Sequence, residues 1–187
     1  MAEGSADDYG LLDRYERVQA AGLADRLLET LDRLTGSIGG YQITRLEHSL
    51  QAATRARLDG ADVNWVVAAL VHDVGDELAP YNHSDLAASI VRPYVPAEVT
   101  WVVAQHGLFQ SYYYAHHLGG DRNGRDQFAG HEWAPLCLDF CARWDQNSFD
   151  PAFPIDPLDS FTDDLCEVFG RPAWRPDVVA VGSQRLF

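Results

Sequence analysis

The sequence contains no lysine: all 14 basic residues are arginine, against 28 acidic residues, and the formal net charge is −14. Without lysine, the protein has no Schiff-base lysine and no P-loop lysine. The excess of acid argues against a DNA- or RNA-binding surface, which depends on basic contacts with phosphates, and an anionic membrane surface would repel the chain. We therefore expect a small-molecule substrate as partner, with no nucleic acid and no membrane. No feature of the sequence indicates the oligomeric state.

The sequence also lacks long apolar runs and has few cysteines. No run approaches the ~18 residues of a membrane span, and the first ten residues lack the basic and apolar regions of a signal peptide. The three cysteines are Cys137, Cys141 and Cys166. An odd number without a secretory signal indicates reduced thiols and a cytoplasmic location. Cys137 and Cys141, four residues apart, allow a zinc or redox role, but small buried thiols are favoured because no further pair completes a site.

Clean two-residue alternation of apolar and polar residues is missing as well, whereas helical periodicity runs through most of the chain. The length of 187 residues suits a single domain, residues 1–187, with an irregular tail at 171–187. The predicted class is all-α. The predicted helices span about residues 7–34, 42–58, 63–74, 83–91, 96–106, 131–144 and 158–169.

The strongest candidate for chemistry is the pair His72-Asp73, at the end of the apolar stretch 65–74. A carboxylate beside an imidazole is costly in a buried helix unless another charge compensates it. An ordinary solvated pair at a helix end is the alternative, since Gly75 follows.

Further histidine and aspartate residues lie at or near the ends of the other predicted helices. Imidazole nitrogens and carboxylate oxygens suit iron, manganese, zinc or cobalt, and four histidines with two aspartates exceed what one ion needs. We infer a dinuclear metal site in which Asp73 is the bridging ligand. The predicted ligands are His48, His72 and Asp145 for one ion and His83 and His106 for the other.

Two segments resemble one branch of the HD-domain superfamily. His48-Ser49-Leu50-Gln51-Ala52-Ala53 is similar to a His-x-x-Gln-x-Ala helix, and Ala69-Leu70-Val71-His72-Asp73-Val74-Gly75 to an Ala-Leu-x-His-Asp-x-Gly motif. Both occur in myo-inositol oxygenase and in the phosphonate-cleaving HD oxygenases. The resemblance covers about residues 41–150.

The resemblance implies a helical bundle around a mixed-valent Fe(II)/Fe(III) centre that uses O2 as co-substrate. Such an enzyme binds the hydroxyl group of a small substrate and attacks the C–H bond beside it, and C–P or C–C cleavage follows. The related enzymes hold their substrates with a basic residue or an imidazole at the position of Asp76. The acid found here puts the inositol and phosphonate specificities in doubt.

Three residues near the expected ligands are candidate substrate contacts. Asp76 lies one helical turn after Asp73 and would meet a cationic or hydroxyl-bearing group, unless it is paired with an arginine. Tyr41, beside a Gly-Gly turn, is a candidate lid, and Gln51 lies about one turn from His48.

A glycine-rich segment further along the chain holds four more candidates. Arg122 and Arg125 would clamp a phosphonate or carboxylate, or would pair with neighbouring acids. Together with Asp76, such a clamp would suit a zwitterion resembling an amino acid or an aminoalkylphosphonate. His116 and His117 are either substrate contacts or hydrogen-bond donors behind the ligands. Of the aromatic run 112–114, most is expected to be core and one residue to line the pocket.

Three functions fit these residues. The first is the di-iron oxygenase. The second is a metal-dependent HD phosphohydrolase, in which a metal-bound hydroxide attacks the phosphorus of a small phosphate ester. The third is a non-enzymatic HD-like binding module. The His-x-x-Gln-x-Ala helix, the six-ligand set and the absence of a basic cluster for nucleotide phosphates favour the oxygenase.

Overall fold

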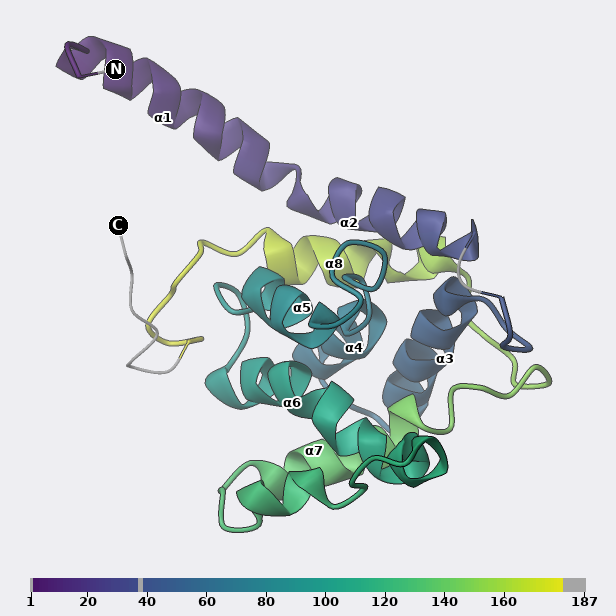
Figure 1. Ribbon diagram of the computed structural model, residues 1–187. Helices are drawn as coiled ribbons and strands as arrows, with labels where there is room; N and C mark the ends of the chain where they lie inside the picture. The colour runs from purple at the N-terminus through teal and green to yellow at the C-terminus, as the bar shows by residue number, and fades with distance from the viewer. Residues whose placement is uncertain (1, 37–38, 180–187) are drawn as a thin grey trace.

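The computed structural model describes residues 2–36 and 39–179, and within these ranges it is built from helices and turns. The described part contains no β-strand, only an isolated bridge between Gly39 and Tyr41. The all-α prediction is confirmed, with helices packed as a bundle (Figure 1). The helices are α1 (Ala6–Ala21), α2 (Leu23–Arg33), α3 (Arg45–Leu58), α4 (Val63–Val71), α5 (His83–Val91), α6 (Ala97–Tyr114), α7 (Ala134–Phe140) and α8 (Thr162–Phe169).

Helix α4 is the centre of the bundle. Its residues 66–71 are all buried, and it contacts α3, α6 and α8. A helix that is apolar all round is stable only inside a core. Asp62 fixes its start by accepting hydrogen bonds from the backbone N–H groups of Asn64 and Trp65. Helix α4 therefore carries His72, the residue after its last turn, into the interior.

Helix α3 packs along α4 and begins at a capping box. The Thr44 side chain accepts the N–H of Glu47, and the Glu47 carboxylate accepts the N–H of Thr44. This cap sets the start of α3 at Arg45, three residues later than the predicted residue 42. It also turns His48 towards the core, where it is buried.

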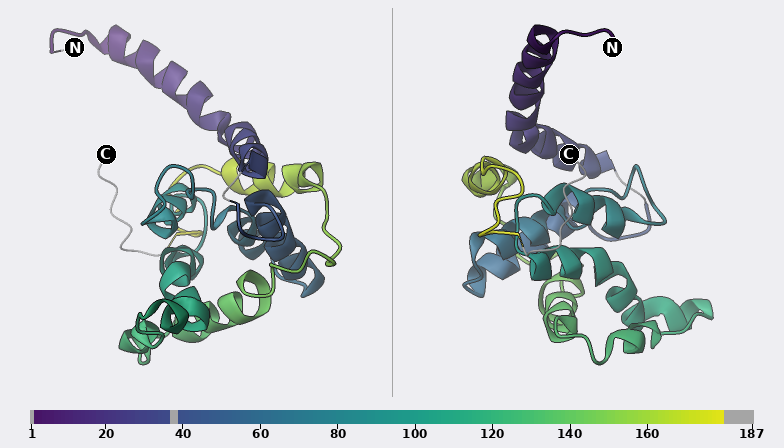
Figure 2. Two further views of the ribbon diagram at one scale, coloured as in Figure 1. Left: turned by 45° about the vertical axis from the view of Figure 1, so that its right-hand side comes forward. Right: turned by 90° about the vertical axis from the view of Figure 1, so that its left-hand side faces the viewer.

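The predicted helix 7–34 is wrong in extent, because it is divided at Gly22 into α1 and α2. Helix α2 buries Ala24, Leu27 and Leu31, and it packs against α8. Helix α1 buries no residue and extends away from the bundle (Figures 1 and 2). The residues that α1 contributes to the predicted apolar face are exposed, and Val18 has the largest exposed fraction among them, 73%. The periodicity correctly indicates a helix, but it does not indicate what covers the helix.

The predicted end of a helix at His106-Gly107 is also wrong, because α6 continues to Tyr114. Gly107 serves close packing instead: a Cβ there would lie 2.8 Å from Ser84 Oγ on α5. Helix α4 ends at Val71, and turns occupy residues 72–78.

The C-terminal part departs less from expectation. Helix α7 is followed by a π-helical turn at Cys141–Asp145, and α8 by irregular chain at 171–179. The rest of the predicted tail, 180–187, lies outside the described residues. Over residues 2–36 and 39–179, no helix has both the length and the apolar character needed to cross a membrane.

Gly75 leads to a first prediction, because α5 packs directly on this turn. A Cβ at position 75 would lie 3.1 Å from the backbone oxygen of His83 and 3.1 Å from Leu86 Cδ2. Overpacking of this kind typically costs about 1–3 kcal/mol. We expect Gly75→Ala to lower the free energy of unfolding by that amount in chemical denaturation. Gly130→Ala is the control, since a Cβ there meets no atom within 4 Å; equal losses in the two variants would contradict the packing argument.

Candidate metal centre

The six predicted ligands converge from different parts of the chain. His48 lies on α3, His72 and Asp73 follow α4, and His83 begins α5. His106 lies in the middle of α6, and Asp145 ends the π-helical turn. Five of these side chains are buried, and that of His83 is 25% exposed.

His48, His72 and Asp145 form one half of the cluster. The two imidazoles face each other with their Nε2 atoms 3.1 Å apart. Asp145 Oδ1 lies 3.4 Å from His48 Nε2 and 3.9 Å from His72 Nε2. Asp145 Oδ2 is buried and has no hydrogen-bond partner. A buried oxygen without a partner is costly, and a cation in this half would compensate it.

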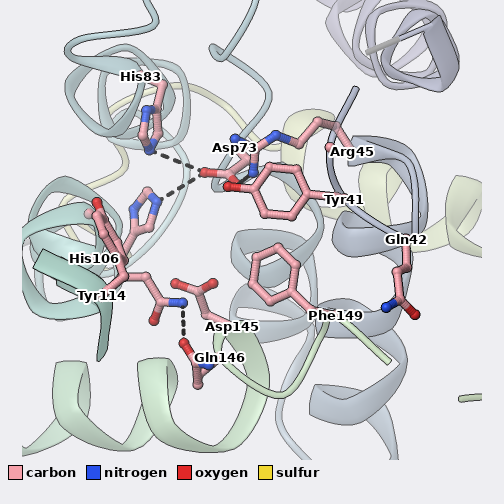
Figure 3. A pocket seen from close by; sticks show the side chains of 13 residues that line it. Tyr41, Gln42, Arg45, Asp73, His83, His106, Tyr114, Asp145, Gln146 and Phe149 are labelled. Carbon is pink, nitrogen blue, oxygen red and sulfur yellow. Dashed lines mark hydrogen bonds and ion pairs between the residues drawn. The ribbon is translucent and has the colours of Figure 1, made fainter. Parts of the chain in front are cut away.

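Asp73 connects this half to the other. Its Oδ2 lies 3.5 Å from His48 Nε2 and 3.6 Å from His72 Nε2. Its Oδ1 lies 3.1 Å from His106 Nε2 and 3.2 Å from His83 Nε2 (Figure 3). One carboxylate thus presents one oxygen to each half, which is the arrangement expected of a bridging ligand.

The backbone fixes three of the four imidazoles through Nδ1. This atom lies 2.8 Å from the carbonyl oxygen of Ser148 in His48, 2.7 Å from that of Ala69 in His72, and 2.7 Å from that of Val103 in His106. A carbonyl only accepts hydrogen bonds, so each Nδ1 carries the proton and each neutral ring presents an Nε2 lone pair to the cluster.

His83 Nδ1 has no hydrogen-bond partner among the described residues and lies near charged side chains instead. Its Nδ1 lies 3.1 Å from Asp76 Oδ1, and Asp76 Oδ2 lies 2.8 Å from Arg45 Nε. A carboxylate behind an imidazole sets the ring orientation and the tautomer of a metal ligand. Burial, and next to it the charge of Asp73, raise the pKa of Asp76, whereas Arg45 and His83 act in the opposite direction.

This donor set fits metal ions. Four Nε2 atoms and the oxygens of two carboxylates face inward, and neighbouring members lie close enough to share an ion. Nitrogen and oxygen donors suit iron, manganese, cobalt or zinc. Three groups of donors have ligand atoms close enough to hold an ion: His48, His72 and Asp145; His72, Asp73 and His106; and Asp73, Asp76 and His83. The buried His/Asp cluster could therefore bind a dinuclear metal centre.

Without metal, charges inside the cluster perturb its pKa values. Burial lowers the pKa of His106, but the hydrogen bond and charge of Asp73 outweigh it and raise the pKa to about 9. Burial also opposes protonation of His48, yet Asp145 and Asp73 raise its pKa. Burial lowers the pKa of His72 to about 4. Protonated His106 thus takes the place of a cation beside Asp73 in the metal-free protein.

We therefore predict that metal binding releases protons near neutral pH. His106 must give up its Nε2 proton to become a ligand, so protons compete with metal below a pH of about 9. Metal affinity should rise from pH 6.5 towards pH 9 and then level off. Calorimetric titration with Zn(II) in two buffers of different ionisation enthalpy measures the number of protons released. A heat independent of the buffer at pH 7 would contradict the prediction.

A cavity of about 520 Å³ opens onto the cluster. Asp73, His83, His106 and Asp145 form its metal-facing side. Its other walls are formed by Gly40, Tyr41, Gln42, Arg45, Gly107, Gln110, Tyr114, Gln146 and Phe149 (Figure 3). Phe149 links the wall to the cluster, because its ring stacks on His48 at 4.4 Å and on Tyr41 at 5.5 Å.

Of the predicted substrate contacts, Tyr41 lines this cavity. Tyr114 also lines it, from the aromatic run in which one such residue is expected. Asp76 is not among the described residues of the wall. It is paired with Arg45, in agreement with the alternative interpretation of Asp76. Gln51 donates from Nε2 to the carbonyl of Asp150 at 2.8 Å and thereby holds the chain beside Phe149.

The other four predicted contacts lie elsewhere. The guanidinium groups of Arg122 and Arg125 lie 4.0 and 3.5 Å from the ring centre of Tyr112. His116 and His117 are exposed, with ring centres 3.9 Å apart. None of the four is among the described lining residues of the cavity.

Sequence reasoning missed several lining residues. Arg45 precedes His48 by three residues and Gln110 follows His106 by four, so helical spacing places each near a predicted ligand. Gln146 directly follows Asp145 and accepts a hydrogen bond from Gln110 Nε2 at 2.8 Å.

A comparison with models of known protein families is consistent with a metal-binding cluster at this position. The family model of the HD domain matches residues 45–133, which include all the predicted ligands except Asp145. No curated protein matches the chain. The match supports the HD-domain superfamily, whose members are generally metal-dependent enzymes, either hydrolases or oxygenases.

Proposed function

We propose that this protein, with its match to the HD domain over residues 45–133, is an oxygenase with a mixed-valent di-iron centre and a small hydroxylated substrate. The observation that carries the proposal is the position of Asp73. One of its oxygens faces His48 and His72 and the other faces His83 and His106, so that both halves share one carboxylate.

The residues of the chain would hold the ions and shape the space beside them. When bound, the iron pair would supply O2 activation and attack on the C–H bond beside the substrate hydroxyl. The imidazoles direct Nε2 towards the centre because their Nδ1 protons are engaged. The Phe149 ring stacks on His48, and the Tyr41 ring stacks on Phe149, so that aromatic rings cover this side of the centre.

The walls of the cavity favour the oxygenase over a phosphohydrolase. Phosphoryl transfer is helped by several cationic donors on the transferred oxygens. Apart from histidine, Arg45 is the single basic side chain among the described residues of the wall. The remaining polar lining residues away from the metal are Gln42, Gln110, Gln146 and two tyrosines. These neutral groups suit a hydroxylated substrate whose C–P or C–C bond is cleaved.

The test uses the whole protein, purified without oxygen and loaded with Fe(II). After limited exposure to O2, we expect the electron paramagnetic resonance signal of a coupled Fe(II)/Fe(III) pair. Hydroxylated phosphonates and amino-acid analogues are then screened for substrate-dependent O2 uptake. Hydrolysis of p-nitrophenyl phosphate with redox-inert metal, and no coupled signal or O2 uptake, would establish the phosphohydrolase instead.

A further inference from the structure

We propose that Arg45 binds an oxyanion at the end of the substrate away from its reactive hydroxyl, and that Asp76 positions Arg45 for this task. The inference rests on the proposed function, since it assumes that the substrate occupies the cavity beside the metal cluster. It identifies the substrate class as small hydroxylated carboxylates or phosphonates.

The position of the guanidinium group is the first argument. Arg45 is the first residue of α3, its side chain is 18% exposed, and it lines the cavity next to Asp73 and Tyr41 (Figure 3). The guanidinium carbon lies 5.1 Å from the ring centre of Tyr41. A ligand in the cavity would therefore meet a planar cation at the edge of the metal centre.

The second argument is the number of donors. Arg45 forms ion pairs with two carboxylates: its Nε lies 2.8 Å from Asp76 Oδ2 and its Nη1 3.5 Å from Asp73 Oδ2. A guanidinium has five N–H donors, which is more than these two contacts involve. Carboxylate and phosphonate groups match its fork with paired hydrogen bonds, which an ammonium group cannot reproduce.

The third argument is that Asp76 restrains the arginine before any ligand binds. Asp76 is buried and held from its other side by His83 Nδ1 at 3.1 Å. The ion pair with Asp76 thus restrains Arg45 without substrate, and a restrained side chain loses less conformational entropy when it binds a ligand. Asp76 acts through Arg45 and is a positioning residue.

The remaining arginine candidates do not compete for this role. Arg122 and Arg125 pack on Tyr112, and they are not among the described residues of the cavity wall. An oxyanion in the cavity would be bound by the metal ions, by Arg45 or by both. The experiment has to separate these contributions.

The experiment measures binding without turnover. The full-length protein is loaded with Zn(II) and titrated calorimetrically with 4-hydroxybutyrate, 3-hydroxypropylphosphonate and the neutral 1,4-butanediol. For the wild type, we expect at least one of the two anions to bind at least tenfold more tightly than the diol. In Arg45→Gln this preference should fall at least tenfold, and Arg45→Lys should restore part of it. The two anions distinguish a carboxylate from a phosphonate site.

Arg92→Gln is the matched control. Arg92 is exposed at the end of α5, so the same change of charge there should leave the preference for the anion unchanged. Zinc content and circular dichroism are measured for each variant. If Arg45→Gln loses zinc, Arg45→Lys tests the inference in its place. Lysine keeps the positive charge, but the preference for the anion over the diol should still fall at least threefold.

Two results would overturn the inference. One is a wild type with no preference for either anion over the diol. The other is a preference equally strong in Arg45→Gln and Arg45→Lys with both zinc ions retained, since the metal alone would then hold the anion. Oxygen plays no part in these titrations, so a failure of this inference can be distinguished from a failure of the proposed oxygenase. If the protein takes up O2 but its anion binding does not depend on Arg45, only this inference fails. If anion binding depends on Arg45 but no O2 is taken up, only the oxygenase proposal fails.

Discussion

Replacing Asp73 by asparagine should cost the protein both metal ions, whereas Asp145→Asn should weaken only one. Asp73 presents Oδ2 to His48 and His72 and Oδ1 to His83 and His106. An asparagine keeps one oxygen and turns an NH2 group, which cannot ligate, towards one half. It also removes the negative charge on which both halves depend. We expect activity to fall by roughly a thousandfold or more, since metal assistance is worth several kcal/mol and each 1.4 kcal/mol is a factor of ten.

Metal analysis of the purified variants tests this prediction. The wild type should hold two ions per chain, Asp145→Asn at least one, and Asp73→Asn fewer than one. Glu77→Gln is the control, because Glu77 lies in the same turn but is exposed, and it should retain both ions. An Asp73→Asn protein that keeps two ions would show that Asp73 is not a shared ligand.

Replacing His83 by alanine should remove one ion and leave the other. His83 belongs to the half that it forms with His106, and its side chain is the most exposed of the six predicted ligands. His48, His72 and Asp145 remain in place, so one ion should stay bound. We expect the coupled paramagnetic signal and O2 uptake to be lost, with iron content falling from two ions to one. Asp76→Ala should weaken the same ion by about 10–100-fold, because it leaves His83 without its carboxylate.

His131→Ala serves as the matched control for this variant. The His131 ring stacks on Trp101 with a centre-to-centre distance of 4.2 Å and takes no part in the cluster. It should keep two ions and the coupled signal. A His83→Ala protein with an unchanged coupled signal would refute the assignment of His83, and so would loss of both ions with the fold intact.

The convergence of the predicted ligands could be anticipated from the sequence because five of the six lie close to a helix end or beside a helix break, whereas His106 lies in the middle of α6. The helix–turn–helix between His48 and His72 returns the chain to its starting level, so these two rings can meet. The pair His72-Asp73 stands out because polar residues interrupt an otherwise apolar segment. The helical class and the convergence of His48 with His72-Asp73 thus follow from local patterns.

The cavity wall was harder to predict, and a wrong helix boundary explains part of the failure. Placing the end of a helix at Gly107 hides the relation between His106 and Gln110, which are one turn apart on α6. The tight contact of Gly107 with Ser84 on α5 depends on tertiary packing, and no local pattern reveals it. The Arg122 guanidinium likewise packs on the ring of Tyr112, and the sequence does not show that these two segments lie side by side.

The N-terminal helix shows the same limit on a larger scale. The apolar residues 11, 12, 15 and 18 have the spacing of a buried face, yet α1 buries none of them. The spacing of Leu27 and Leu31 is no clearer, but these two residues meet α8. Periodicity identifies a face, and only the fold decides whether another element covers it.

The backbone anchoring of His48, His72 and His106 has a consequence for how such an enzyme changes its substrate over evolution. Carbonyl oxygens survive any side-chain substitution, so exchanges at Gln42, Gln110 or Gln146 alter what the cavity accepts and leave three ligands in place. At the corner of Arg45, Asp76 and His83, the residue proposed to recognise the substrate is ion-paired through Asp76 to a predicted ligand. Directed evolution towards new substrates should therefore accumulate substitutions at Gln42, Gln110 and Gln146 and conserve Arg45, Asp76 and His83.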